Sequence, residues 1–397
     1  MKQSYAAALA LLALAACADQ QPTSSAARTA PVRSVAADGK YIVVLEEGAN
    51  PRSVAAIAGI NPTHVYTAAL TGFAAELNAG QLNALQHNPS VDYVEADAPV
   101  KLFTTQTTVY SWGIDRIDSR DLPLSNTFVY TGEGAGTHVY ILDSGINKAH
   151  LDFGARANYI PSAANGNFVG DARPDASDCH GHGTHVAGTA AGTYSGVAKS
   201  ATIWAGRVVN CSGGGTTSMV IAGMDWVAAN GLKPAAVNMS LGYGNVQSVR
   251  DAATRLVAAG FVVVAAAGNG NFGGTPIDAC TEAPAGAPTV ITVGSTTNTD
   301  AESSFSNYGT CVDILAPGSA IMSSDYTVTN GLVSKSGTSM ASPHVAGVAA
   351  VYLGLNPLAT PAQVTSAIKA NGTPNTITLH TRSKKGFTPN LFLFHNY

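Results

Sequence analysis

The sequence is organised around one stretch, Gly337–Gly347, which reads GTSMASPHVAG. The apolar residues from Met340 to Leu353 predict a helix, so Ser339 should lie at a helix N-terminus, just after a Gly-Thr turn. Backbone N–H groups are free at a helix N-terminus and can hold a developing oxyanion. A serine hydroxyl also needs an adjacent base before it can act as a nucleophile. Taken alone, the stretch also fits an ordinary helix cap, because serine is a common N-cap residue.

Two stretches upstream carry the partners that such a serine would need. HGHGTHVAG at His180–Gly188 supplies histidines, and VYILDSGI at Val139–Ile146 ends an apolar run with Asp143. Together with the serine stretch, they closely resemble the three signature motifs of the subtilisin-like serine proteases. The order Asp, His, Ser is that of subtilisin and differs from the orders of chymotrypsin and the α/β-hydrolases. The resemblance is strongest to the proteinase K and aqualysin branch, and it covers about Trp112 to the C-terminus.

The resemblance implies a serine endopeptidase with Ser339 as nucleophile and His182 as the base that later protonates the leaving amine. Asp143 would hold the imidazole in the required tautomer. The family's His-Gly-Thr-His pattern makes its first histidine catalytic, and in this chain that residue is His182. The other two histidines could serve as metal ligands, but we expect His185 to pack inside its helix and His180 to lie in a loop.

Further site residues follow from the same resemblance. Asn269, at the end of an apolar run, would complete the oxyanion hole with its side chain, although Asn-Gly is also a strong turn pair. Substrate should bind as an added β-strand. The segments that would border it are Gly213, Gly214, Gly215 and Ser240, Leu241, Gly242. The glycine run also fits a plain flexible loop. Since these segments carry no charge, the resemblance implies broad specificity that favours hydrophobic or aromatic side chains before the scissile bond.

Apolar runs alternate with helical patterns through most of the chain, which predicts an α/β fold. Such runs are typical of a mainly parallel sheet covered on both faces, hence a three-layer, subtilisin-like domain. Active sites in these sheets lie at the carboxyl ends of strands, which is where Asp143 follows its run. The predicted strands are Thr137–Leu142, Ala201–Val209, Ala235–Leu241, Gly260–Ala266 and Thr289–Gly294. The predicted helices are His185–Thr193, Thr217–Ala229, Val246–Ala259, Met340–Leu353 and Pro361–Asn371.

A smaller domain is predicted at residues 40–103, before the catalytic domain at 104–397. Its pattern β-α-β-β-α-β predicts a ferredoxin-like α+β sandwich. ALTGFAA at Ala69–Ala75 resembles the inhibitor propeptide of subtilases. The resemblance implies a self-processing zymogen in which this propeptide is an intramolecular inhibitor and is cut off between about Lys101 and Val109. An independent binding module is the alternative interpretation.

The first 39 residues are expected to serve export rather than the fold. The apolar run Ala6–Ala16 is too short to span a bilayer and is typical of a signal peptide. It ends in a sequence that resembles a bacterial lipoprotein box, which would place a lipid on Cys17. An ordinary secretory signal is the alternative. Residues 18–39 have the composition of a flexible linker. We therefore expect a secreted protein whose precursor meets a membrane only through this lipid.

The remaining cysteines predict disulfides, because an even number occurs in an exported chain. Sequence alone allows three pairings, and a zinc site is a second interpretation. The resemblance favours pairing Cys179 with Cys211 and Cys280 with Cys311. It also implies a structural Ca²⁺ held by the carbonyls of Pro288 and Val290 and the carboxylate of Asp313, a ligand set of hard oxygens that suits this ion. No catalytic cofactor is expected.

Composition and motif details exclude other classes of protein. Charged residues make up 12% of the chain and the net charge is −4, which argues against nucleic-acid binding. A lipase or esterase would need Gly-x-Ser-x-Gly, but Ala341 breaks that motif. A sedolisin would lack the catalytic histidine, and a non-catalytic surface-binding protein on this fold would be expected to have lost part of the triad. We expect a monomer that acts on polypeptide substrates.

Overall fold

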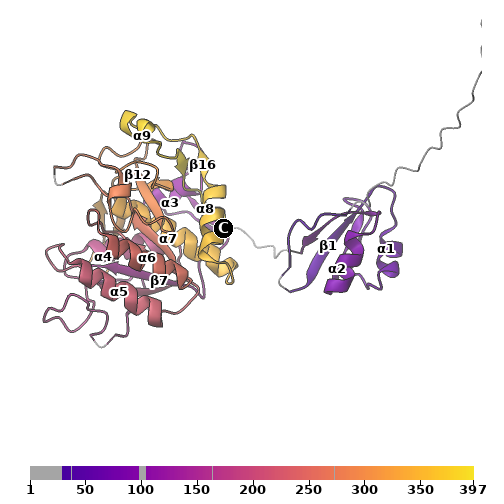
Figure 1. Ribbon diagram of the computed structural model, residues 1–397, viewed down its shortest axis with the longest axis horizontal. Coiled ribbons are helices and arrows are strands. Elements are labelled where there is room, and N and C mark those ends of the chain that lie inside the picture. The colour runs from indigo at the N-terminus through magenta and orange to yellow at the C-terminus, as the bar shows by residue number, and fades with distance from the viewer. Residues whose placement is uncertain (1–28, 37, 98–103, 163, 272) are drawn as a thin grey trace, which may run out of the picture. The chain divides into compact units, whose positions relative to one another are not determined.

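The computed structural model describes residues 29–36, 38–97, 104–162, 164–271 and 273–397. The chain forms two compact units, one ending at Lys101 and the other beginning at Leu102 (Figure 1). The predicted signal peptide and the predicted lipid site at Cys17 lie outside the described residues. Within the described part of the chain, no helix has the length and apolar character needed to cross a membrane.

The smaller unit is a four-stranded antiparallel sheet with two helices packed against it. The sheet order β2-β3-β1-β4 and the chain order β-α-β-β-α-β confirm the predicted ferredoxin-like arrangement. Each helix starts at an asparagine, Asn50 or Asn78, whose side-chain oxygen accepts from backbone N–H groups of the first turn. The elements are β1 (Lys40–Leu45), α1 (Pro51–Ile57), β2 (His64–Tyr66), β3 (Gly72–Glu76), α2 (Ala79–Gln86) and β4 (Val91–Ala96).

Part of the segment predicted as a flexible linker, residues 18–39, lies along the edge of this sheet instead. Val94 of β4 donates its N–H to Pro31 O at 3.0 Å, and Arg33 donates its N–H to Val94 O at 2.9 Å. The guanidinium of Arg33 also stacks over the ring of Tyr93, 3.5 Å from its centroid. An open strand edge offers unpaired N–H and C=O groups, so even a polar segment can pair there.

The larger unit is built on a nine-stranded sheet of order β16-β17-β13-β12-β11-β10-β7-β9-β8, parallel except where β16 meets β17. This topology confirms the predicted three-layer α/β fold. The strands are β7 (His138–Asp143), β8 (Ala157–Tyr159), β9 (Thr202–Arg207), β10 (Ala235–Met239), β11 (Val262–Ala266), β12 (Ile291–Thr296), β13 (Ile314–Pro317), β16 (Thr373–Pro374) and β17 (Leu391–Phe392). The large helices are α4 (His182–Ala191), α5 (Thr217–Asn230), α6 (Gln247–Ala258), α7 (Thr338–Leu355) and α8 (Pro361–Asn371).

Both faces of this sheet are buried. Because successive side chains in a strand point to opposite faces, each one packs against the helices of one face only. In β7, Val139 and Ile141 belong to the core that contains α4, α7 and α8. Tyr140 and Leu142 point the other way, into the core that contains α5 and α6. Continuous apolar strands are therefore required, because neither face of the sheet meets water.

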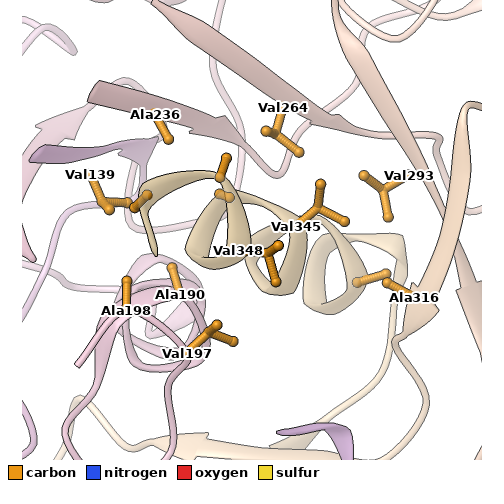
Figure 2. Packing of buried hydrophobic residues seen from close by; sticks show 14 of the residues in the cluster. Val139, Ala190, Val197, Ala198, Ala236, Val264, Val293, Ala316, Val345 and Val348 are labelled. Carbon is orange, nitrogen blue, oxygen red and sulfur yellow. The ribbon is translucent and has the colours of Figure 1, made fainter. Parts of the chain in front are cut away.

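The helix α7 lies against the centre of the sheet (Figure 2). Its Val345 and Val348 are fully buried among side chains of several strands and of α4. Burying a valine stabilises a fold by about 1.5–3 kcal/mol, so this helix is fixed in place by its packing. Ser339, the predicted nucleophile, lies in the first turn of α7, so the same packing fixes its position.

Several short elements are absent from the sequence-based prediction. The C-terminal segment supplies β16 and β17 to the main sheet. Phe392 of β17 is fully buried under the guanidinium of Arg116, 4.4 Å from the ring centroid. The others are β5 (Thr104–Gln106), α3 (Trp112–Ile117), β6 (Phe128–Tyr130), β8 (Ala157–Tyr159), a 3₁₀ turn (Ala279–Thr281), β13 (Ile314–Pro317), β14 (Ile321–Ser324), β15 (Leu332–Lys335) and α9 (Thr381–Lys385).

Candidate active site

A carboxylate and an imidazole meet at the carboxyl end of β7. Asp143 is the last residue of that strand and its side chain is 2% exposed. The Nδ1 atom of His182 lies 2.8 Å from Asp143 Oδ1 and 3.0 Å from Oδ2. Because the carboxylate accepts, the proton of the neutral ring is on Nδ1, and Nε2 is left as the basic nitrogen.

Gly183 allows α4 to come this close to β7. A Cβ at this position would lie 2.2 Å from Gly145 O and 3.2 Å from the Cβ of Asp143. Any larger residue would push the helix away from the strand and separate the imidazole from its carboxylate. The first helical residue is His182, earlier than the predicted start at His185, so the imidazole is mounted on regular structure.

Asp178 organises the loop that leads into this helix, and sequence analysis missed it. Its Oδ1 accepts from Ser144 Oγ at 2.9 Å, His180 N at 2.9 Å and Gly181 N at 2.8 Å. Its Oδ2 accepts from the backbone N–H and the hydroxyl of Thr184, at 2.9 and 2.6 Å. The carboxylate thus caps the first turn of α4 and ties it to the residue after Asp143. An aspartate close before a helix start was the available signal.

Two opposing effects set the protonation of His182. Burial lowers the pKa of the ring, but the charge of Asp143 and its hydrogen bond raise it by more, so the pKa of His182 stands above its ordinary value. The pair is therefore arranged to stabilise the imidazolium. A base that gains a proton during a reaction needs such a partner.

The two neighbouring histidines do not take part in this pair. His185 is fully buried, and its Nε2 lies 3.0 Å from both Ile321 O and Val333 O. Burial lowers the pKa of His185 to about 3, so this ring stays neutral and joins α4 to the hairpin β14–β15. His180 is an exposed loop residue whose ring centroid lies 6.3 Å from that of His182.

Ser339 lies inside the first turn of α7, which begins at Thr338 after the N-cap Gly337. Its Oγ donates to Ser240 O at 3.1 Å, while its own carbonyl accepts from Ser240 Oγ at 2.8 Å. Ser240 follows β10, so this double contact fixes the start of α7 against the carboxyl end of the sheet. The structure thereby attaches Ser339 to a residue that lines the same cleft as His182.

The amide of Asn269 is oriented by the turn that precedes Ser339. Its Oδ1 accepts from the backbone N–H and the hydroxyl of Thr338, at 2.8 and 2.9 Å. The Nδ2 donor must then face the other way, toward Gly337. A Cβ on Gly337 would lie 3.3 Å from this Nδ2 and 3.6 Å from Ser339 N. Both N–H donors therefore lie close to one position, which is 3.7 Å from the Cβ of Ser339.

One cleft brings together the predicted substrate segments and the charged pair. Its lining residues are Asp143, His180, His182, Val209, Gly213, Gly214, Gly215, Ser240, Leu241, Gly242 and Tyr243. The glycine run is an ordered loop. Asn210 accepts from the N–H of Ser212 and Gly214 with its side chain and from the N–H of Gly213 with its carbonyl. A Cβ on Gly215 would lie 2.7 Å from Val208 O, so this close backbone approach requires glycine.

The four described cysteines form two disulfides, Cys179–Cys211 and Cys280–Cys311. The first closes a loop with a sequence separation of 32 residues and joins the segment before His182 to the glycine run of the cleft. In the chain-entropy model, a loop of this length adds about 3–4 kcal/mol of stability. The zinc interpretation therefore fails for these residues, because their sulfurs are bonded to one another.

Of the residues predicted to hold calcium, Pro288, Val290 and Asp313, the carboxylate of Asp313 is bound to other groups. Asp313 is held against the start of β12, where its Oδ2 accepts from Thr292 N at 3.0 Å. Its Oδ1 accepts from the ammonium of Lys369 at 2.8 Å. A lysine ammonium next to Ca²⁺ is repulsive, so the residues as placed do not fit the ion. Among the described residues, no group of three or more His, Cys, Asp or Glu side chains is arranged to bind a metal.

A parallel sheet that presents a carboxylate, an imidazole, a serine and two N–H donors at one edge has the fold and chemistry of a serine endopeptidase. The chain belongs to the subtilase family, whose pattern it matches at residues 134–387. Residues 40–103 match the peptidase inhibitor I9 family, so the smaller unit is an inhibitor propeptide domain. Enzymes of this kind use no catalytic cofactor.

Known proteins similar to this chain agree with that assignment. It is 42% identical to an extracellular serine proteinase from Thermus sp. (strain Rt41A), with 97% of each chain aligned. It is 46% identical to alkaline serine exoprotease A of Vibrio alginolyticus over 79% of this chain and 57% of that protein. The crystal structure of a cold-adapted subtilisin-like serine proteinase superposes with a TM-score of 0.67 at 44% identity, covering 74% of this chain and all of the other.

Proposed function

We propose that Ser339, His182 and Asp143 form the catalytic triad of this peptidase, and that Asn269 completes its oxyanion hole. The observation that supports this most directly is the bond from His182 Nδ1 to the buried Asp143. It leaves Nε2 as the basic nitrogen of a ring that lines the same cleft as Ser240, the residue that accepts from the Ser339 hydroxyl. No other described pair of acid and base in that cleft has this geometry.

The proton path requires one movement. The Ser339 hydroxyl, which donates to Ser240 O at 3.1 Å, rotates toward His182 when a substrate carbonyl arrives. His182 then takes the proton as Ser339 Oγ attacks, and Asp143 stabilises the imidazolium that forms. In the second half of that step His182 returns the proton to the leaving amine, and an acyl-enzyme remains for water to hydrolyse.

The oxyanion is stabilised by Asn269 Nδ2 and by the backbone N–H of Ser339. Both donors lie close to Gly337 and neither must reorganise, because Thr338 already orients the amide. Such preorganised donors act where charge develops, and losing one typically lowers kcat by about 10²–10³. Substrate backbone would pair with the segments at 213–215 and 240–242. We propose broad specificity favouring hydrophobic or aromatic residues before the scissile bond.

The inhibitor domain makes the chain a zymogen that cuts itself. We place the cut between Lys101 and Val109, at the junction of domains 40–103 and 104–397. β5 pairs with β6 within the peptidase unit, so a cut before Thr104 would keep that strand and a cut after Gln106 would remove it. The protein is proposed to be secreted, since the relative from Thermus is named an extracellular proteinase. Its precursor would carry a lipid on Cys17, and the mature enzyme would be a monomer.

A labelling experiment with casein as substrate tests this function. The processed protein should hydrolyse casein, and a fluorophosphonate should abolish that activity while modifying Ser339. Ser339→Ala protein should neither cut casein nor take up label, and it should accumulate as the uncut precursor. Ser336→Ala, which changes an exposed serine just before the turn, is the matched control and should behave as wild type. Normal processing of pure Ser339→Ala protein would rule out self-cleavage by this serine.

A further inference from the structure

Glu282 lies beside the segments proposed to border the substrate, although the sequence analysis found no charge in those segments. It follows the 3₁₀ turn and is fixed by its backbone: its N–H donates to Ala279 O at 3.1 Å, and its carbonyl accepts from Gly286 N at 2.7 Å. The next carbonyl, that of Ala283, accepts from Tyr243 N at 2.9 Å. These bonds hold Glu282 against the segment at 240–243, one of the two segments proposed to border the substrate.

The side chain of Glu282 lies between two glycines of the site. A Cβ on Gly242 would lie 3.2 Å from Glu282 Oε2, and a Cβ on Gly268 would lie 3.5 Å from Glu282 Cγ. Gly242 comes two residues after Ser240, which accepts from the Ser339 hydroxyl, and Gly268 directly precedes Asn269. Two residues of extended chain span at most about 7 Å, a distance that one long side chain can bridge.

The Glu282 carboxylate accepts no hydrogen bond from any described residue and forms no ion pair with one. The charge of Arg250 acts on this carboxylate, but its Nη2 donates to the carbonyls of Cys280 and Glu282, at 2.6 and 3.3 Å. Burial raises the pKa of Glu282, and the charge of Arg250 opposes this only in part. A half-buried carboxylate without donors is costly, unless a ligand supplies them.

We propose that Glu282 determines specificity at the base of the pocket for the side chain before the scissile bond, and that it admits lysine and arginine there. This inference rests on the proposed function of Ser339. The hydrocarbon stem of a lysine would pass between Gly242 and Gly268, and its ammonium would reach the carboxylate. Hydrophobic side chains still enter, because a shorter side chain leaves the carboxylate partly hydrated. Glu282 thus adds lysine and arginine to the hydrophobic side chains that the pocket accepts.

Peptide p-nitroanilides that differ only before the scissile bond provide the test. Lysine and norleucine have the same stem and differ in charge, so the ratio of their kcat/KM values isolates the ammonium. In processed enzyme, Glu282→Gln should lower the lysine-to-norleucine ratio by about tenfold to a hundredfold, the usual worth of a charge-assisted bond. The norleucine rate should stay within about twofold. Asp225→Asn, an exposed acid on α5, is the matched control and should leave the ratio unchanged.

Each outcome tests either this inference or the proposed function of Ser339 on which it rests. If wild type cleaves neither substrate and Ser339 takes no fluorophosphonate, the proposed function fails first. If both substrates are cleaved but Glu282→Gln leaves the ratio within about twofold of wild type, or Asp225→Asn lowers it equally, the inference is overturned. Fluorophosphonate titration verifies that the Glu282→Gln variant is folded. If the variant is not folded, the salt dependence of wild-type enzyme is the test. The lysine-to-norleucine ratio of wild type should fall with added NaCl, and a ratio that does not change with salt would refute the ion pair.

Discussion

At the scale of single residues, the site depends on side chains that hold other side chains. The imidazole of His182 is oriented by Asp143, the amide of Asn269 by Thr338, and the start of α4 by Asp178. Each of these supporting contacts is a hydrogen bond from a rigid element. Preorganisation of this kind lowers the barrier because the donors and the base need not be reoriented during the reaction.

The pH profile should reflect the raised pKa of His182. The base must be neutral, so kcat/KM should fall as pH drops through a midpoint above 6.5, the ordinary value, and stay high in mild alkali. The stability contributed by this pair should change with pH in the opposite direction to kcat/KM. The protonated pair contributes stability that is complete below pH 6.5 and lost as pH rises through the folded pKa. Rates on a peptide p-nitroanilide across this range check the midpoint, and a maximum near about pH 4 would contradict a histidine base.

Asp178 should act as a positioning residue. Asp178→Ala leaves the N–H groups of His180, Gly181 and Thr184 without their acceptor, which should cost about 2–3 kcal/mol of stability. Displacing the start of α4 should lower kcat about tenfold or more, with little change in KM. Asp175→Asn, in the same loop, is the control because, among the described residues, its carboxylate accepts only from Ser177 N at 2.9 Å. Equal losses in both variants would show that the loop, rather than Asp178, is what matters.

At the scale of secondary-structure elements, contacts between distant segments build the site. Gly183 lets α4 approach β7, Ser240 joins the end of β10 to the start of α7, and the Cys179–Cys211 disulfide ties the loop before α4 to the glycine run. The contacts of Asp313 are of the same kind, because this residue before β13 binds both the start of β12 and Lys369 of α8.

Lys369 of α8 should compete with calcium for Asp313. Lys369→Ala frees Oδ1, so added Ca²⁺ should raise the melting temperature of this variant more than that of wild type, by about 2–4 °C for each kcal/mol of binding. The measurement uses processed enzyme blocked with fluorophosphonate, which prevents self-digestion. Lys384→Ala on α9 is the control, and Asp313→Asn should remove any response. If neither Ca²⁺ nor chelator moves the melting temperature of Lys369→Ala, the calcium assignment fails.

At the scale of the whole molecule, the chain combines an inhibitor domain with the enzyme that it precedes. The proposed cut separates everything before about Lys101 from the peptidase. If Cys17 carries a lipid, the anchor therefore remains with the propeptide. A membrane-bound precursor would give rise to a soluble protease, once the inhibitor domain has been digested.

Fractionation of cells tests this order of events. Ser339→Ala precursor should stay with the membrane at full length, whereas mature wild-type enzyme should appear in the soluble fraction. Adding Cys17→Ser to the Ser339→Ala precursor should release it from the membrane, and Cys17→Ser in wild type should leave the peptidase activity intact. The hypothesis is wrong if the double variant stays membrane-bound, or if mature protease remains anchored after its propeptide is gone.

The sequence by itself determined the features that rest on local patterns. The apolar runs predicted the parallel sheet and its covering helices, since a strand buried on both faces must be apolar throughout. The chain order of the three motifs identified Asp143, His182 and Ser339 as candidates, because each motif combines a chemical group with the turn that presents it. The family resemblance also predicted the cysteine pairing that the structure forms.

Only the tertiary structure decided which distant segments meet. The pairing of residues 31–33 with β4 and the ammonium of Lys369 on Asp313 leave no local signature. Glu282 is the clearest case. In sequence it is an acid after a turn, whereas in the fold it lies between Gly242 and Gly268. Contacts of this kind depend on how the layers pack, and a hydrophobic period specifies the face that a residue joins but not its neighbour across that face.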